Sequence, residues 1–365
     1  MSSQALETNH HLNGQSASLR LAWDFGTAYD LFVSLLVLHD PEQYDLRASW
    51  AAGVRSRLPA AERKLLEDVT GINWVPFHWI HNLPEPKDAA SVLWSLRKTP
   101  PAERMMAFIP KDKDPEVYAT FAEIAARGSW DNSDLERLCQ ATHEKMHQQE
   151  AKKYPRFLDW WARPGEFGEL YLSALQAYYQ SFFAEEEKRI APILRQGLQQ
   201  AIELSGRMQI PDLLAELSQG VHFGAFEADE LVLTPSFWST PLVMWGKISP
   251  NQVLLLYGAR PATTSLVPGE QVPDGLLRVL KAMADPTRLL ILRLLTEEPL
   301  TPAQLARRLR LRAPTVTHHL SALRLAGLVH LSLGANDERV YATRLEAVRT
   351  TLGQLEQYMQ TTKEI

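Results

Sequence analysis

Residues 285–328 carry start and stop signals for three successive helices, and these signals constrain the fold more than any other feature. The Asp-Pro pair at 285–286 and the Thr-Pro pair at 301–302 each place a capping side chain before a residue without a backbone N–H. Gln304 completes a capping box with the threonine. Gly327 is typical of a helix C-terminal cap. We therefore expect three short, well-delimited helices in this segment.

The flanking pattern extends this segment into a longer module. Residues 276–284 predict a first helix, 328–333 and 338–344 predict two strands joined by "GAND", and 345–359 predict an amphipathic last helix. The second helix is expected to be largely buried through its five leucines, Leu289, Leu290, Leu292, Leu294 and Leu295. Helix, helix, short helix, turn, helix, hairpin and helix is the order of a winged helix-turn-helix, which places one helix in the DNA major groove.

Four stretches of this module, "LKAMADPTRLLILRLL", "TPAQLARRLRL", "PTVTHHLSALRLAGLV" and "ERVYATR", resemble the ArsR family of winged-helix transcriptional regulators. The resemblance covers about the last quarter of the chain. It implies a symmetric homodimer formed by the first and last helices of the module, and repression that a ligand relieves. The first 260 residues lie outside the usual family, so we interpret them as a fused domain, with a sensor role as one hypothesis.

Helical spacing of 100° per residue separates two faces of the helix at 313–326. Val316, Leu320 and Leu323 share the face expected to pack inward, whereas His319 lies at its edge and is expected to be half-buried. Short polar side chains on the other face suit contacts with phosphates and base edges. With the basic residues around the helix and on the wing, the candidate DNA-binding residues are Arg310, Arg312, Thr315, Thr317, His318, Ser321, Arg324 and Arg339. The alternative is an ordinary solvated surface.

Charge is unevenly distributed along the chain. Residues 276–365 hold 13 Lys and Arg against 8 Asp and Glu, whereas the whole chain has a formal net charge of −5. A basic C-terminal quarter on an acidic body favours local binding of a polyanion such as double-stranded DNA. In the family, a small capping residue usually stands where this chain has Arg312, so we expect the helix at 313–326 to be less well capped.

The remaining sequence predicts a mainly helical fold with β-hairpins. We expect a disordered tail at 1–18, a helical domain at 19–218, two β-hairpins within 219–262, a linker at 263–275 and the winged helix at 276–365. Residues 25–41 predict a buried helix that ends before Pro41, and 221–235 and 241–260 predict the two hairpins.

A second hypothesis concerns the segment "HEKMH" at 143–147. Two histidines four residues apart, His143 and His147, lie on one face of a helix and match the pattern of a zinc hydrolase or a metal sensor, with Glu144 as general base. The polar flanks and the lack of an indicated third ligand disfavour this reading. The family's metal sites cannot be transferred, because the corresponding helices lack the cysteines and histidines. We therefore expect no enzyme activity and no cofactor.

The single cysteine, Cys139, cannot form an internal disulfide, and neither a secretory signal nor a membrane-spanning stretch is evident, so we expect a cytoplasmic protein. The aromatic and histidine-rich stretch at 72–84 is a candidate wall for an effector cavity or a subunit interface. The alternative to a sensor is an oligomerisation or partner-binding domain with no small ligand.

Overall fold

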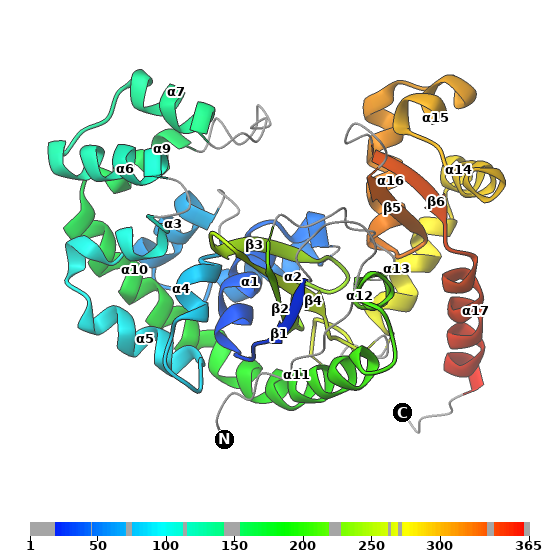
Figure 1. The fold of residues 1–365 in the computed structure, drawn as a ribbon, viewed down its shortest axis with the longest axis horizontal. Helices are drawn as coiled ribbons and strands as arrows, with labels where there is room; N and C mark the ends of the chain where they lie inside the picture. Colours follow the sequence, from blue (N-terminus) through cyan, green and yellow to red (C-terminus); the bar gives the residue numbers. More distant parts are fainter. Residues whose placement is uncertain are drawn as a thin grey trace. The chain divides into compact units, whose positions relative to one another are not determined.

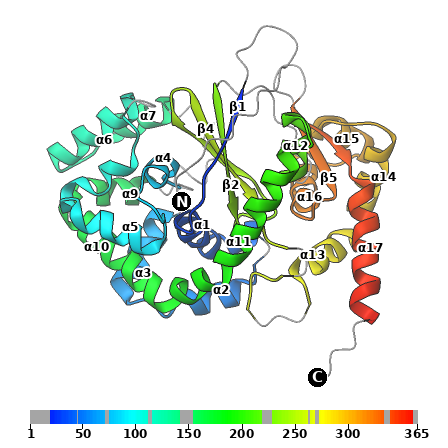
Figure 2. The ribbon, with the colours of Figure 1, turned by 60° about the horizontal axis from the view of Figure 1, so that its bottom comes forward.

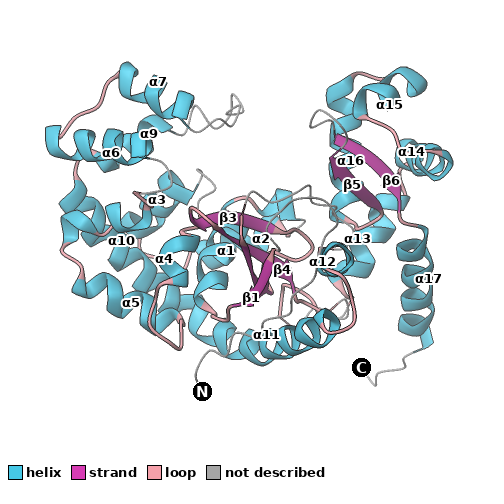
Figure 3. Cartoon of the chain, in the orientation of Figure 1, coloured by secondary structure: helices cyan, strands magenta, loops and turns pink. Residues whose placement is uncertain are grey.

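The computed structural model describes residues 19–44, 46–70, 75–111, 115–141, 154–218, 228–261, 264–268, 272–333 and 339–360. Helices predominate in these ranges, which confirms the mainly helical fold class (Figures 1 and 3). The chain divides into two compact units. The N-terminal unit comprises Met1–Leu198, Ala228–Ser239 and Met244–Leu256, and the C-terminal unit comprises Gln199–Glu227, Thr240–Val243 and Tyr257–Ile365.

Helix α1 (Ala28–His39) is the core of the N-terminal unit, because every residue from Ala28 to Leu38 is buried. It confirms the buried helix expected before Pro41. In the described part of the first two hundred residues, the other helices are α2 (Ala48–Arg55), α3 (Ala60–Val69), α4 (Phe77–His81), α5 (Ala89–Lys98), α6 (Pro115–Arg127), α7 (Asn132–Ala141), α9 (Tyr154–Trp161), α10 (Pro164–Tyr178) and α11 (Ala184–Ser205). The π-helical turn η5 (Tyr179–Phe183) lies between the last two, and the 3₁₀ turns are η1 (Pro41–Tyr44), η3 (Pro101–Glu103) and η4 (Met106–Phe108).

A four-stranded sheet lies beside α1 (Figure 2). Its order is β1 (Arg20–Trp23), β2 (Glu230–Ser236), β4 (Gln252–Gly258) and β3 (Met244–Ser249). The antiparallel β3–β4 pair confirms the hairpin predicted within 241–260. Of the hairpin predicted at 221–235, the structure describes only the second strand, β2, which lies between β1 and β4 and runs parallel to β1. The parallel pairing with β1 was not predicted. Residues 219–227 lie outside the described residues.

Two buried carboxylates join these elements. Asp30, on α1, accepts hydrogen bonds from the Ser236 hydroxyl (2.7 Å) and from the backbone N–H groups of Phe237 and Trp238 (2.9 Å each). Complete burial raises the pKa of Asp30 to about 6, although these three donors act in the opposite direction. The bonds hold α1 against the end of β2.

Asp24 follows β1 and is the second of these carboxylates. It accepts hydrogen bonds from the Tyr29 hydroxyl, the His81 Nδ1 and the Lys87 Nζ, each at 2.7 Å. Burial alone would raise the pKa of Asp24, but the bonds from His81 and Lys87 and the charge of Lys87 outweigh it and lower the pKa to about 2. This network ties α1, α4 and the chain before α5 to the end of β1.

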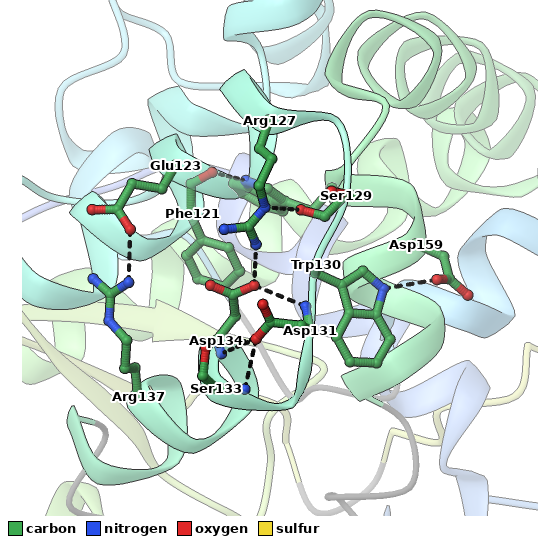
Figure 4. Close-up of polar contacts among 11 residues, drawn as sticks. Phe121, Glu123, Arg127, Ser129, Trp130, Asp131, Ser133, Asp134, Arg137 and Asp159 are labelled. Atoms are coloured by element: carbon green, nitrogen blue, oxygen red, sulfur yellow. Dashed lines mark hydrogen bonds and ion pairs between the residues drawn. The ribbon is translucent and has the colours of Figure 1, made fainter.

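The turn between α6 and α7 is fixed by a polar network (Figure 4). Asp131 accepts from the backbone N–H of Ser133 (2.7 Å), and Asp134 accepts from the backbone N–H of Asp131 (2.9 Å) and from the Arg127 guanidinium. The Trp130 indole donates to Asp159 (2.8 Å), which attaches the turn to α9. These bonds orient the start of α7.

The C-terminal unit contains the expected winged helix. After α12 (Ile210–Leu217), its order is α13 (Asp274–Met283), α14 (Pro286–Glu297), α15 (Pro302–Leu309), α16 (Ala313–Leu325), β5 (Val329–Leu333), β6 (Arg339–Thr343) and α17 (Leu345–Gln360). Side chains from all of these elements from α13 onward pack into one apolar core or against it. The Leu300 and Tyr341 backbones exchange two hydrogen bonds of 2.9 Å, which attach the α14–α15 connection to β6.

The helix caps expected from the sequence are present. The Asp285 carboxylate accepts from the backbone N–H of Arg288 at 2.9 Å. Thr301 and Gln304 form the reciprocal capping box. The expected burial of α14 is wrong at two positions, because Leu289 and Leu290 are 47% and 50% exposed, whereas Leu292 and Leu295 are buried.

The stretch before α13 contributes buried side chains, since Ser265, Leu266 and Val267 are all buried. The domain boundaries expected from the sequence stay predictions. In the part of the chain that the structure describes, no helix combines the length and the apolar character needed to cross a membrane.

Candidate nucleic-acid interface

The turn between α15 and α16 sets the direction of the helix expected to read DNA. Arg310 adopts the left-handed conformation with φ of 54°, and the Leu311 N–H donates back to the Ala306 carbonyl at 3.0 Å. This is the geometry of a Schellman cap, in which glycine usually occupies the left-handed position. The chain reverses sharply here, so α16 begins only three residues later.

Helix α16 has the two faces that its sequence predicts. Val316, Leu320 and Leu323 are buried in the core of the C-terminal unit. The opposite face is polar: Thr315, Thr317, His318 and Ser321 are exposed, and Arg324 is half-buried. Among the described residues, this polar face is therefore open to a binding partner.

The two ends of α16 differ in their capping. Arg312 is the N-terminal cap residue and its side chain makes no capping hydrogen bond, as expected. Thr317 donates its hydroxyl to the Ala313 carbonyl at 3.0 Å, which fixes the rotamer of a candidate contact residue. At the other end Gly327 has φ of 67°, and the Leu328 N–H returns to the Leu323 carbonyl at 2.9 Å, which confirms the glycine cap.

Basic side chains surround the exposed face. Arg310 and Arg312 precede α16, and both are exposed. Arg339 begins β6, opposite Leu333, and is also exposed, so it lies on the wing as predicted; the wing tip at 334–338 is outside the described residues. Arg308 differs from its neighbours because it forms an ion pair with Glu298.

His319 lies at the boundary of the buried face, as its helical position predicts. Its side chain is 14% exposed, and its Nδ1 lies 3.9 Å from the Asp285 Oδ1 at the start of α14. This nitrogen is buried and has no hydrogen-bond partner. The neighbouring His318 is exposed, and the ring centroids of the two histidines are 6.0 Å apart.

Helix α17 presents apolar side chains in two directions. Val348, Thr351 and Leu355 are buried or half-buried, whereas Leu345, Leu352 and Met359 are 47%, 53% and 73% exposed. The exposed three are seven residues apart, which is the spacing of one helical stripe. Val348 and Leu355, on the half-buried side, are also seven residues apart, so the spacing alone does not tell the two sides apart.

Residues 285–330 match the model for bacterial regulatory proteins of the arsR family. This segment is an ArsR-family helix-turn-helix domain. The match begins at the cap of α14 and ends within β5, so it includes α16 with its exposed polar face. The presence of this domain indicates that the protein is a DNA-binding transcriptional regulator.

A crystal structure of an ArsR family transcriptional regulator is 27% identical to this chain. The similarity covers 25% of this chain and 97% of the other, with a TM-score of 0.21. A comparison with curated proteins gave no match.

Among the described residues, no three His, Cys, Asp or Glu side chains lie close enough together to hold one metal ion. The HEKMH segment, with His143 and His147, lies outside the described residues, between α7 and α9. The alternative of a metal-dependent hydrolase or metal sensor therefore stays a prediction.

Proposed function

We propose that this protein is a transcriptional repressor that binds double-stranded DNA as a homodimer and places one α16 from each subunit in successive major grooves. The observation that carries the proposal is the uncovered polar face of α16, within a segment that matches the arsR family model. A helix at this position of a winged helix-turn-helix contacts base edges, and the wing contacts the DNA backbone or the minor groove.

The exposed side chains divide into two proposed roles. The hydroxyls of Thr315 and Ser321 and the imidazole of His318 contact base edges or phosphates, since all three can donate and accept hydrogen bonds. Thr317, which donates its hydroxyl hydrogen to Ala313, contributes through the lone pairs of its oxygen and through its methyl group. The guanidinium groups of Arg310, Arg312, Arg324 and Arg339 neutralise phosphates, which gives binding that weakens as salt rises.

We propose that the two subunits of the dimer pair through the exposed stripe of α17. Leu345, Leu352 and Met359 form an apolar surface with heptad spacing, and such a surface pairs with another helix. The family resemblance assigns the dimer interface to the helices that correspond to α13 and α17. A symmetric pair then presents two copies of α16 to a two-fold related DNA site.

An effector response is the remaining part of the proposal, with no catalytic step and with the cytoplasm as its location. We place the effector at a hollow of about 280 Å³ in the N-terminal unit. His78 and Asn82, from the aromatic and histidine-rich stretch, line it together with Pro110, Lys111, Ile248, Ser249 and Pro250. An effector there regulates DNA binding only if it binds the DNA-competent and DNA-incompetent states with different affinity.

The test of DNA binding is an electrophoretic mobility shift with the full-length chain and the DNA upstream of its own gene. We expect specific binding at moderate salt, and Arg312→Ala is expected to weaken it and to reduce the salt slope by about one counterion. Arg207→Ala is the matched control, because it removes an equally exposed arginine outside the winged helix. Absence of specific binding contradicts the proposal, as does an equal loss in both variants.

The effector is tested separately, by screening small molecules for changes in tryptophan fluorescence and then for release of bound DNA. Trp79 adjoins His78 in α4 and serves as a reporter. A ligand that changes the fluorescence and releases DNA in the wild type, but not in Asn82→Ala, supports a sensor. If no ligand releases DNA and the chain still assembles, the N-terminal unit is an oligomerisation or partner-binding module.

A further inference from the structure

The contact between His319 and Asp285 joins the recognition helix to the junction of two other helices. Asp285 ends the α13–α14 connection and caps α14. Arg288, one turn into α14, donates from its guanidinium to the Ala282 and Lys281 carbonyls at 2.7 and 2.9 Å, which caps the end of α13. Through His319, α16 therefore meets the point where α13 and α14 are held together.

This contact is incomplete in its neutral form. The buried Nδ1 of His319 makes no hydrogen bond, and a buried polar nitrogen without a partner destabilises the folded state. At 3.9 Å, the Asp285 Oδ1 is slightly too far from this nitrogen for a hydrogen bond. When a second proton makes the ring an imidazolium, both ring nitrogens are donors and the ring carries a positive charge that faces a carboxylate.

We propose that His319 is a positioning residue for the recognition helix, and that its protonation closes the contact with Asp285 and strengthens DNA binding. This inference rests on the proposed function. His319 acts through Asp285 and is not itself a base contact, because it lies at the buried edge of α16. The closed pair fixes α16 in one orientation relative to α13 and α14. Less conformational entropy is then lost when the protein binds DNA.

Asp285 is suited to this role over the neutral range. The hydrogen bond from the Arg288 backbone N–H lowers the pKa of Asp285, and the charges of Arg288 and His319 lower it further against a small effect of burial. Asp285 is therefore ionised throughout pH 6–8, so a proton taken up by His319 faces a negative charge. Asn caps a helix about as well as Asp, so Asp285→Asn removes the charge while it keeps the cap.

Other charged groups near α16 come from each element packed on it. The charge of Arg288 on α14 acts on Asp285, and the ring of His318 on α16 lies beside that of His319. Other charged or titratable groups on these elements include Arg278 and Lys281 on α13, Arg293 and Glu297 on α14, Arg307 and the Glu298-paired Arg308 on α15, Arg324 on α16 and His330 on β5. Asp285 is the carboxylate among them that contacts His319.

The experiment measures the affinity of the full-length chain for its upstream DNA at pH 8 and pH 6, at constant salt. We expect the gain in affinity on acidification to be about two- to fivefold larger in the wild type than in Asp285→Asn or His319→Gln. Glu346→Gln is the matched control, because it neutralises an exposed carboxylate of the same unit and is expected to keep the wild-type gain. Equal gains in the wild type and Asp285→Asn overturn the proposal.

A second readout separates this inference from the proposed function. Urea unfolding of the same proteins without DNA is expected to show that the wild type gains stability relative to Asp285→Asn between pH 8 and pH 6. If DNA is not bound at either pH but this gain is present, the proposed function fails and the contact stands. If the gain in stability is absent, the contact does not close on protonation, whatever the DNA result. If Asp285→Asn does not fold, Asp285→Ser is used in its place.

Discussion

Two requirements at position 310, now occupied by Arg310, favour different residue types. Its left-handed backbone suits glycine, since a side chain there costs conformational energy. Its position before α16 suits a cation that contacts a phosphate. The chain has arginine, so we interpret the backbone strain as the cost of a phosphate contact.

Arg310→Gly is expected to raise the free energy of unfolding by about 0.5–1 kcal/mol, because glycine adopts the left-handed conformation without penalty. The same variant is expected to bind DNA more weakly through the loss of a cation. Urea unfolding and a DNA titration measure the two effects. Gly327→Ala, at the other left-handed position, is expected to lower stability by about 1 kcal/mol, and a stabilised Gly327→Ala or a destabilised Arg310→Gly contradicts this account.

Asp30 makes the stability of the N-terminal unit depend on pH. Burial raises its folded-state pKa from the ordinary value of 3.8 to about 6, so the unfolded chain loses this proton at lower pH than the folded chain does. Stability from this group is therefore highest below about pH 4 and falls as pH rises to about 6, by up to about 3 kcal/mol. Tryptophan-detected urea unfolding of the wild type and Asp30→Asn across pH 4–7 checks this: the difference between them must change over that range.

The elements differ in how far their sequences predict them, and the physical reason is the range of the interactions. The bounds of α14, α15 and α16 follow from caps such as Thr301 and Gly327, whose partners lie within a few residues. Strand β1 was not predicted because its partner, β2, is about two hundred residues away in the chain. We predicted that Leu289 and Leu290 are buried because both are apolar and lie on a helix. This pattern does not say whether the same chain or another protein molecule buries them.

Helix α16 gives the clearest prediction at this scale. Arg312 has the extended backbone of an N-terminal cap but no capping side chain, so Arg312→Ser is expected to stabilise the domain by about 0.5–1 kcal/mol. Removal of the cation is expected to weaken DNA binding in the same protein. Thermal unfolding together with a DNA titration checks both signs, and a loss of stability would show that Arg312 holds α16 in a way the cap geometry does not reveal.

At the scale of the whole molecule, the candidate site was predictable in position and only partly in its partners. The inward face of α16 and the half-buried His319 followed from helical spacing, whereas the Asp285 contact and the Arg308–Glu298 ion pair required the tertiary fold. The two-unit division follows contacts between distant segments, such as β1 with β2, which local sequence patterns do not encode.

The dimer is tested with Leu352→Glu. A carboxylate in the middle of the apolar stripe of α17 is expected to abolish the homodimer, because the buried charge would have no partner. Sedimentation velocity at micromolar concentration is expected to show a dimer for the wild type and a monomer for the variant. Glu346→Gln, on an exposed ion pair of the same helix, is expected to stay dimeric; a dimeric Leu352→Glu would place the interface elsewhere.

The most direct measurement of the central claim is a footprint of the full-length protein on the DNA upstream of its own gene. If two copies of α16 read successive major grooves, cleavage protection falls on two segments whose centres lie one helical turn, about 10 base pairs, apart. The combined Arg312→Ala and Ser321→Ala variant is expected to lose both segments at the same protein concentration. Protection of a single segment, or an unchanged footprint with that variant, would contradict the account.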